Sequence, residues 1–239
     1  TGIVHYLLLI VTSLPSTMEK ENSMSISRDE RARAAVLATL AADSLSLGAH
    51  WVYDPEQIAA RHGTVDRLLP PMAKYHSGKQ AGDLTHYGDQ ALVLLETVSQ
   101  GNVFSLDVFF QRWKELFADY KGYVDGASRK TLQRIEFGEG PESCGSNSDD
   151  LAGASRFGVL AQHLPDGDAL ERAAVAQAAM THNNPLILDS ARFFARTLAL
   201  VLGGEAPVPA MKQAAEMDYQ SAPIAQWTAS GLDTKDTDS

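Results

Sequence analysis

Helical hydrophobic patterns, framed by helix start and stop signals, constrain this fold more than any other feature of the sequence. Ser27 and Glu30 have the S-x-x-E spacing of a capping box, and Ala and Leu then recur at helical spacing. Asp54, Pro55 and Gly63 frame a short second helix in the same way. No alternating run is long enough to predict a strand. The sequence therefore predicts an all-α protein.

The later patterns predict a single domain of about eight to ten helices in total. Residues 63–88 have no sustained period and form a long connection, which is typical of a functional segment. We expect residues 1–23 to be a poorly ordered leader, residues 24–232 to form one all-α domain, and residues 233–239 to be a polar tail. The later predicted helices are 89–99, 106–120, 126–136, 149–163, 169–182, 186–202, 207–217 and 222–230.

Charge and cysteine content argue against several classes of function. The formal net charge is −10 and no block of consecutive Lys or Arg occurs, so we expect no nucleic-acid or membrane partner. The longest apolar run, at 6–11, is far shorter than the roughly 20 residues that span a bilayer. The single cysteine, Cys144, cannot form an internal disulfide, which fits a reducing compartment and predicts a cytoplasmic protein.

Two aspartates, Asp43 and Asp89, are candidates for a functional site. Asp89 directly precedes an apolar helical pattern, so it is either a helix N-cap or a metal ligand. Asp43 lies among leucines in a helix that is apolar or small on most sides, and an unpaired charge is costly there. Its partner could be an arginine, a backbone amide or a divalent cation.

Two later segments also have alternative interpretations. The small residues of Gly145–Ser148 could present N–H groups to an anion at a helix N-terminus. Equally, Ser148 could be an ordinary cap, with Asp149 and Asp150 in the first turn. His182 either ends a helix before Pro185 or turns into a ligand cleft.

Four segments of the chain occur in a characteristic order. They are "LAADSLSLGAHWVYD", "YGDQALVLLE", "GSNSDDLAGASR" and "MTHNNP". Together they resemble the ADP-ribosylglycohydrolase family, and most closely its branch of jellyfish J-type crystallins and related selenoproteins. The resemblance runs from about residue 28 to residue 232. It implies a compact, single-domain, orthogonal assembly of helices.

The resemblance also implies a metal-dependent activity. Active members use a pair of magnesium ions to hydrolyse the bond that joins ADP-ribose to an acceptor such as a protein side chain. By position, Asp43 matches the early Gly-Asp segment of the family and Asp89 matches the first aspartate of its Thr-Asp-Asp-Thr motif, so both are predicted magnesium ligands. The resemblance places Gly145, Ser146, Asn147 and Ser148 at the ADP-ribose phosphates and His182 near the same ligand.

The chain departs from the family pattern at several reactive positions. Gly88, Gln90 and Ala91 replace the other three residues of the Thr-Asp-Asp-Thr motif. His50 stands where active relatives have an acidic residue. The last metal segment of the family is matched only in part by "KDTDS" at 235–239, and we expect the chain to stop before the equivalent region.

These observations give two hypotheses. The first is a magnesium-dependent hydrolase of ADP-ribosyl N- or O-glycosidic bonds. The second is a catalytically impaired family member that binds an ADP-ribose-type ligand or serves as a structural, crystallin-like protein. The replaced motif residues motivate the second hypothesis.

Overall fold

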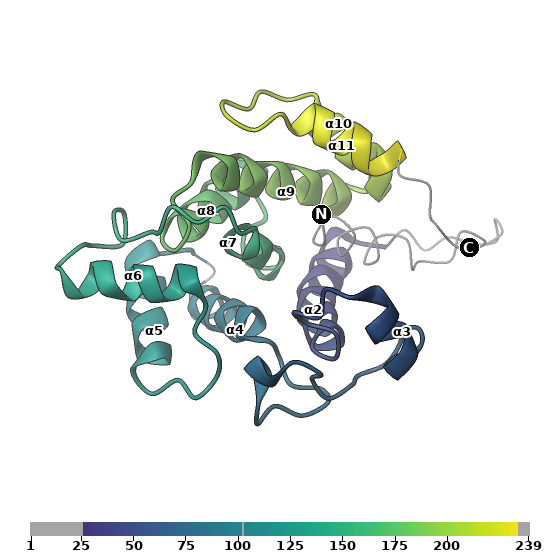
Figure 1. Ribbon diagram of the computed structural model, residues 1–239. Coiled ribbons are helices and arrows are strands. Elements are labelled where there is room, and N and C mark those ends of the chain that lie inside the picture. The colour runs from purple at the N-terminus through teal and green to yellow at the C-terminus, as the bar shows by residue number, and fades with distance from the viewer. Residues whose placement is uncertain (1–25, 102, 234–239) are drawn as a thin grey trace.

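A computed structural model describes residues 26–101 and 103–233, and within those ranges the chain forms helices and no strand (Figure 1). This confirms the all-α prediction. The predicted leader at 1–23 and most of the predicted tail lie outside the described residues. The helices are α2 (Arg28–Ser46), α3 (Pro55–His62), η1 (Lys74–His76), α4 (His86–Ser99), α5 (Leu106–Ala118), α6 (Gly126–Glu136), α7 (Ala152–Ser155), η2 (Arg156–Leu160), α8 (Gly167–Ala179), α9 (Pro185–Gly203), α10 (Pro207–Ala215) and α11 (Ile224–Asp233).

The start and stop signals of the sequence act as expected in the first two helices. The Ser27 hydroxyl accepts a hydrogen bond from the Glu30 N–H at 3.2 Å, and the Glu30 carboxylate accepts one from the Ser27 N–H at 2.7 Å. The Asp54 carboxylate caps α3 at the N–H groups of the first turn. Gly63 ends that helix with a φ of 66°, a conformation that suits glycine.

The main hydrophobic core lies between α4, α5, α8 and η2. Leu94, Phe109, Trp113 and Leu160 are fully buried there, and the small residues of α8 allow close packing against them. Figure 1 shows α9 beside α8, with α10 and α11 beyond α9. The end of α2 and the beginning of α4 meet on the opposite side from α10 and α11, where the long connection 63–85 also lies.

Most helix boundaries differ from the prediction by one to three residues, and two differences bear on the site. Helix α4 starts at His86, before the predicted position 89, because Thr85 caps it. The predicted helix 149–163 is instead the short α7 followed by the 3₁₀ turn η2. No helix among the described residues combines the length and the apolar character needed to cross a membrane.

Candidate functional site

The first turn of α4 is organised by Thr85, which lies directly before the helix. The Thr85 side-chain oxygen accepts hydrogen bonds from the backbone N–H groups of Tyr87 at 3.1 Å and Gly88 at 3.4 Å. Thr85 also donates twice to the Asp43 carboxylate of α2, from its backbone N–H and from its hydroxyl, both at 2.7 Å. Thr85 therefore joins the end of α2 to the beginning of α4, and backbone and hydroxyl donors are the partners of Asp43.

Asp43 lies directly against the helix backbone at Gly88. A Cβ atom at position 88 would clash with the Asp43 Oδ2 atom, so only glycine permits this approach. Burial raises the pKa of Asp43 to about 6, against hydrogen bonds from Thr85 that lower it. The Asp43 carboxylate lies against Gly88, the residue before Asp89, and the charge of Asp89 also raises this pKa. A carboxyl group with a pKa of about 6 suits acid or base catalysis near neutral pH.

Asp89 lies in the first turn of α4 and is engaged by a lysine and a tyrosine. Its Oδ2 atom lies 2.8 Å from the Lys79 Nζ atom, and both side chains are mostly buried. The same oxygen accepts a hydrogen bond from the Tyr120 hydroxyl. Burial and this hydrogen bond raise the pKa of Tyr120, so the tyrosine remains a donor. The N-cap interpretation of Asp89 is wrong, because Thr85 is the cap.

Protein partners at Asp43 and Asp89 compete with a pair of magnesium ions at this site. Mg²⁺ prefers about six oxygen ligands in octahedral geometry. Both Asp43 oxygens accept hydrogen bonds from Thr85, and Lys79 already places a positive charge on Asp89. The acidic "KDTDS" segment lies mostly outside the described residues. Magnesium binding at Asp43 and Asp89 stays a prediction.

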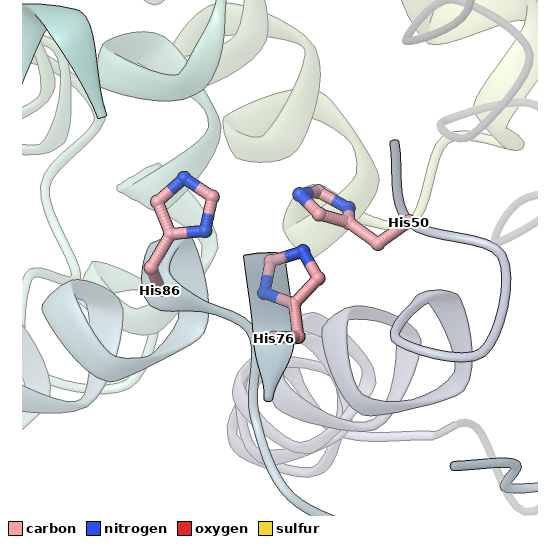
Figure 2. Close-up of side chains that lie close together, drawn as sticks. All are labelled: His50, His76 and His86. Atoms are coloured by element: carbon pink, nitrogen blue, oxygen red, sulfur yellow. The ribbon is translucent and has the colours of Figure 1, made fainter. Parts of the chain in front are cut away.

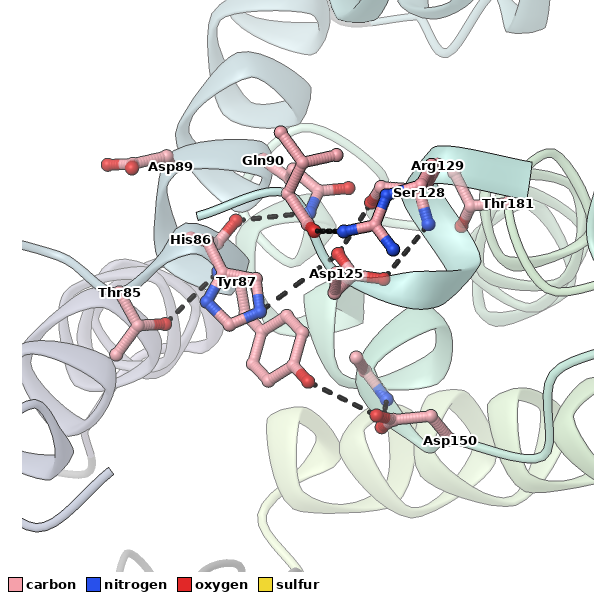
Figure 3. Close-up of polar contacts among 12 residues, drawn as sticks. Thr85, His86, Tyr87, Asp89, Gln90, Asp125, Ser128, Arg129, Asp150 and Thr181 are labelled. Atoms are coloured by element: carbon pink, nitrogen blue, oxygen red, sulfur yellow. Dashed lines mark hydrogen bonds and ion pairs between the residues drawn. The ribbon is translucent and has the colours of Figure 1, made fainter. Parts of the chain in front are cut away.

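Gln90 stands where the Thr-Asp-Asp-Thr motif has its second aspartate, but its side chain makes hydrogen bonds within the core. Its side-chain oxygen accepts hydrogen bonds from the Trp113 indole N–H at 2.8 Å and from the buried Arg156 at 2.9 Å. Burial lowers the pKa of Arg156 to about 10, and its guanidinium also donates to Gln177. Figure 3 shows Asp89 and Gln90 on different sides of α4. Gln90 is therefore unavailable to a metal bound at Asp89.

The predicted phosphate-binding segment, Gly145–Ser148, folds against the end of α8. The Ser146 N–H and hydroxyl both donate to the Thr181 carbonyl, at 3.0 and 2.8 Å. The Ser148 N–H donates weakly to the Ser146 hydroxyl at 3.4 Å. Two N–H groups of the segment thus have protein acceptors, while Asn147 is exposed.

The helix expected after this segment is displaced along the chain. α7 begins only at Ala152 and has no side-chain cap, so the interpretation of Ser148 as its cap is wrong. Ser148 and Asp150 form successive turns instead, each accepting a hydrogen bond from an N–H two residues on. The Tyr87 hydroxyl of α4 donates to the Asp150 carboxylate at 3.1 Å (Figure 3). The segment is thereby connected to the first turn of α4.

His182 lies beside the Gly145–Ser148 segment, to which an isolated bridge with Ser146 joins it. Its Nδ1 atom lies 2.8 Å from the Thr181 hydroxyl, and the ring is 3% exposed. Burial and then the charge of Arg156 lower the pKa of His182 to about 3. The imidazole is therefore neutral, and it is buried at the loop base instead of facing solvent.

Asp125, which the sequence analysis did not identify, lies near both His86 in the first turn of α4 and His182 beside the Gly145–Ser148 segment. It caps α6, accepting hydrogen bonds from the Ser128 N–H at 2.9 Å and hydroxyl at 2.6 Å. Burial would raise the pKa of Asp125, but the Ser128 bonds and the nearby His86 and His182 together lower it. Its Oδ2 atom lies 4.0 Å from His86 Nε2 (Figure 3). The available sequence signal was the spacing of an Asp cap with a serine three residues on.

Lys79 and Tyr120 were also missed. Lys79 lies in the aperiodic connection before α4, and Tyr120 lies just beyond the end of α5. Tyr120 falls at the end of the predicted helix 106–120, but α5 ends at Ala118, and the period of that helix did not indicate a functional role. Lys79 carries neither a helical period nor a motif, and the unusual length of the 63–85 connection was the available signal. Their importance comes from tertiary contacts with Asp89.

Comparison with known families identifies the family of the chain. Residues 24–236 match the ADP-ribosylglycohydrolase family. A search of curated proteins finds no match. The family match covers Asp43, Asp89, the Gly145–Ser148 segment and His182, and the fold has the all-α character of the family. The chain therefore belongs to the ADP-ribosylglycohydrolase family.

Proposed function

We propose that this protein hydrolyses the N- or O-glycosidic bond that joins ADP-ribose to an acceptor. One observation carries the proposal: Asp43 and Asp89, far apart in sequence, converge at the first turn of α4 in a chain of this family. Two neighbouring carboxylates with different partners are a common basis for glycoside hydrolysis.

The partners of the two carboxylates support different roles. Cleavage at the ribose builds positive charge on the sugar ring, which a fixed negative charge stabilises. Asp89, held by Lys79 and Tyr120, supplies such a charge. Asp43, with a pKa of about 6, exchanges a proton with the attacking water or the leaving group.

A neighbouring pocket supports a nucleotide-like substrate. It has a volume of about 420 Å³, and its lining includes Trp51, Tyr75, Arg61 and Lys74. Aromatic faces can stack on an adenine, and the two cations can meet a diphosphate. The Trp51 ring also contacts the His86 ring of α4, with centroids 5.3 Å apart. We infer that this pocket receives the ADP portion of the substrate.

The proposal is tested by release of free ADP-ribose from two substrates, an arginine-linked and a serine-linked ADP-ribosyl peptide. Each is assayed with Mg²⁺ and with a chelator, which tests the predicted magnesium dependence separately. We expect turnover of at least one bond type, and a loss of about 100-fold or more in D43N and D89N.

The matched control is Asp66→Asn, because Asp66 is an exposed aspartate that pairs only with its neighbour Arg67 among the described contacts. D66N should retain the wild-type rate. Background release from the wild-type protein on both substrates, with and without Mg²⁺, would contradict the proposal.

A second candidate, binding without turnover, is favoured by the pairing of Asp89 with Lys79 and by the use of Gln90 in the core. Calorimetric titration with ADP-ribose distinguishes its two forms. Saturable heat without release indicates a binder, whereas no heat indicates a structural protein like those of the J-type crystallin branch. Turnover would exclude both forms.

A further inference from the structure

Three histidines from different segments bring their rings together beside the start of α4. His50 lies in the turn after α2, His76 lies in η1, and His86 is the first residue of α4. One ring nitrogen from each lies within 4.8 Å of the other two. Figure 2 shows the three rings gathered around a common space. We call these residues the histidine trio.

Most ring nitrogens of the trio have no hydrogen-bond partner in the described part of the chain. His50 Nε2 and both nitrogens of His76 and His86 are buried and unpaired. His76 is 2% exposed and His86 is 0% exposed, so these atoms are shielded from solvent. Buried polar atoms are nearly always paired. A single cation between the rings would accept one lone pair from each histidine.

The three rings have the protonation state that a metal requires. Burial lowers the pKa of His50 to about 3 and that of His86 to about 4. Burial, followed by the charge of Lys79, also lowers the pKa of His76. Neutral imidazole is the form that coordinates metal ions.

The surrounding charges favour a cation. Asp89 and Asp125 carry negative charge near the trio, and the ammonium of Lys79 offsets part of it. Asp125 lies 4.0 Å from His86 Nε2, and Figure 2 shows the other nitrogen of that ring turned towards His76 and His50. A carboxylate behind a ligating imidazole fixes its orientation and strengthens it as a ligand.

An aromatic wall encloses the trio. Trp51 packs against His86, Tyr75 and Tyr123, with ring centroids 4.7 to 5.3 Å apart. Trp51 has a φ of 61°, an uncommon conformation for a residue other than glycine. Such conformations are retained where the surroundings hold them, often beside a ligand site. The Trp51 ring also stacks on that of His50, the residue before it, with centroids 5.9 Å apart.

We propose that the histidine trio binds one divalent transition-metal ion, zinc being the best match, with one coordination position left open. Tetrahedral Zn–N bonds of about 2.0 to 2.1 Å place the ligand nitrogens about 3.4 Å apart. The ring nitrogens of the trio, which lie within 4.8 Å of one another, need to close only a short distance to reach this spacing. Mg²⁺ and Ca²⁺ require oxygen ligands and do not suit three imidazoles. The ion ties the turn after α2 to η1 and α4, and its binding does not depend on the hydrolase proposal.

The test uses the full chain, freed of metal by a chelator, and the metal ions alone. Calorimetric titration with Zn²⁺ should give one ion per chain, and a tenfold excess of Mg²⁺ should not displace it. Co²⁺ in place of Zn²⁺ should give the intense visible absorption of a tetrahedral site. Zn²⁺ should also raise the Tm of the protein, because it binds only the folded state at this site.

The variants H76Q and H50Q should each weaken Zn²⁺ binding by about 100-fold or more, by loss of one of three ligands. The matched control is His62→Gln, because His62 Nε2 is also buried and unpaired but lies at the end of α3, outside the trio. Circular dichroism of each variant confirms that it is folded. Absence of stoichiometric binding to the wild type, or equal affinity in H50Q, H76Q and the wild type, would overturn the proposal.

Discussion

Single atoms decide the geometry around Asp43, because Gly88 leaves no side chain between that carboxylate and α4. Thr85 donates two hydrogen bonds to the carboxylate, and the carboxylate also packs against the α4 backbone at Gly88.

Gly88→Ala should therefore damage both stability and activity. The new methyl group would displace the Asp43 carboxylate from Thr85, and overpacking of this kind costs about 1 to 3 kcal/mol. Urea unfolding measures the loss of stability, and ADP-ribose release measures the loss of activity. Gly126→Ala is the control, since a Cβ at the exposed first position of α6 contacts nothing within 4 Å. Equal stability of the two variants would contradict this account of Gly88.

His182 makes the stability of the fold depend on pH. Its pKa is about 3 in the folded protein and about 6.5 when unfolded, so between these values the unfolded chain binds more protons. The contribution of neutral His182 is complete above pH 6.5 and is lost as the pH falls towards 3. Asp43, whose pKa is raised, acts in the opposite sense between about pH 6 and 4.

His182→Asn should remove this part of the pH dependence. Between pH 6 and pH 5 the free energy of unfolding of the wild type should fall by about 1 kcal/mol more than that of H182N. Urea titrations of both proteins at the two pH values measure the difference. Parallel losses in the two proteins would show that His182 is not held neutral by the fold.

At the scale of elements, two predicted N-caps were correct and two, Asp89 and Ser148, were wrong. The Ser27 and Asp54 caps were correct, since local spacing alone determines them. The start of α4 was placed too late, because the apolar period begins only after Asp89 and the Thr85 cap precedes a polar first turn. Helix 149–163 was wrong because tertiary contacts shorten it, with buried Arg156 reaching Gln177 and Gln90.

The contact between α2 and η2 gives a prediction for these elements. A Cβ at Gly158 would clash with the Thr39 hydroxyl, which donates to the Ala35 carbonyl in α2. Gly158→Ala should lower the free energy of unfolding by about 1 to 3 kcal/mol. Adding Thr39→Ala removes the obstructing hydroxyl and should recover most of that loss in urea unfolding. Additive losses in the double variant would mean that the two elements do not meet in this way.

At the scale of the whole molecule, the fold class and family were predictable from the sequence, whereas the contacts of the site were not. Helical periodicity and the ordered segments are visible in the chain itself. The pairing of Lys79 and Tyr120 with Asp89, and the meeting of three histidines, depend on how distant segments pack. No periodicity encodes those contacts, so the sequence could not predict them.

The central claim is that Asp43 and Asp89 act as one reactive site, and a double-mutant cycle on ADP-ribose release tests it most directly. Rates are measured for the wild type, D43N, D89N and the double variant on the substrate that the wild type prefers. Residues that act as a unit give non-additive losses. The account predicts that the double variant is no slower than the slower single variant. Fully multiplicative losses, or a wild-type rate in either single variant, would contradict it.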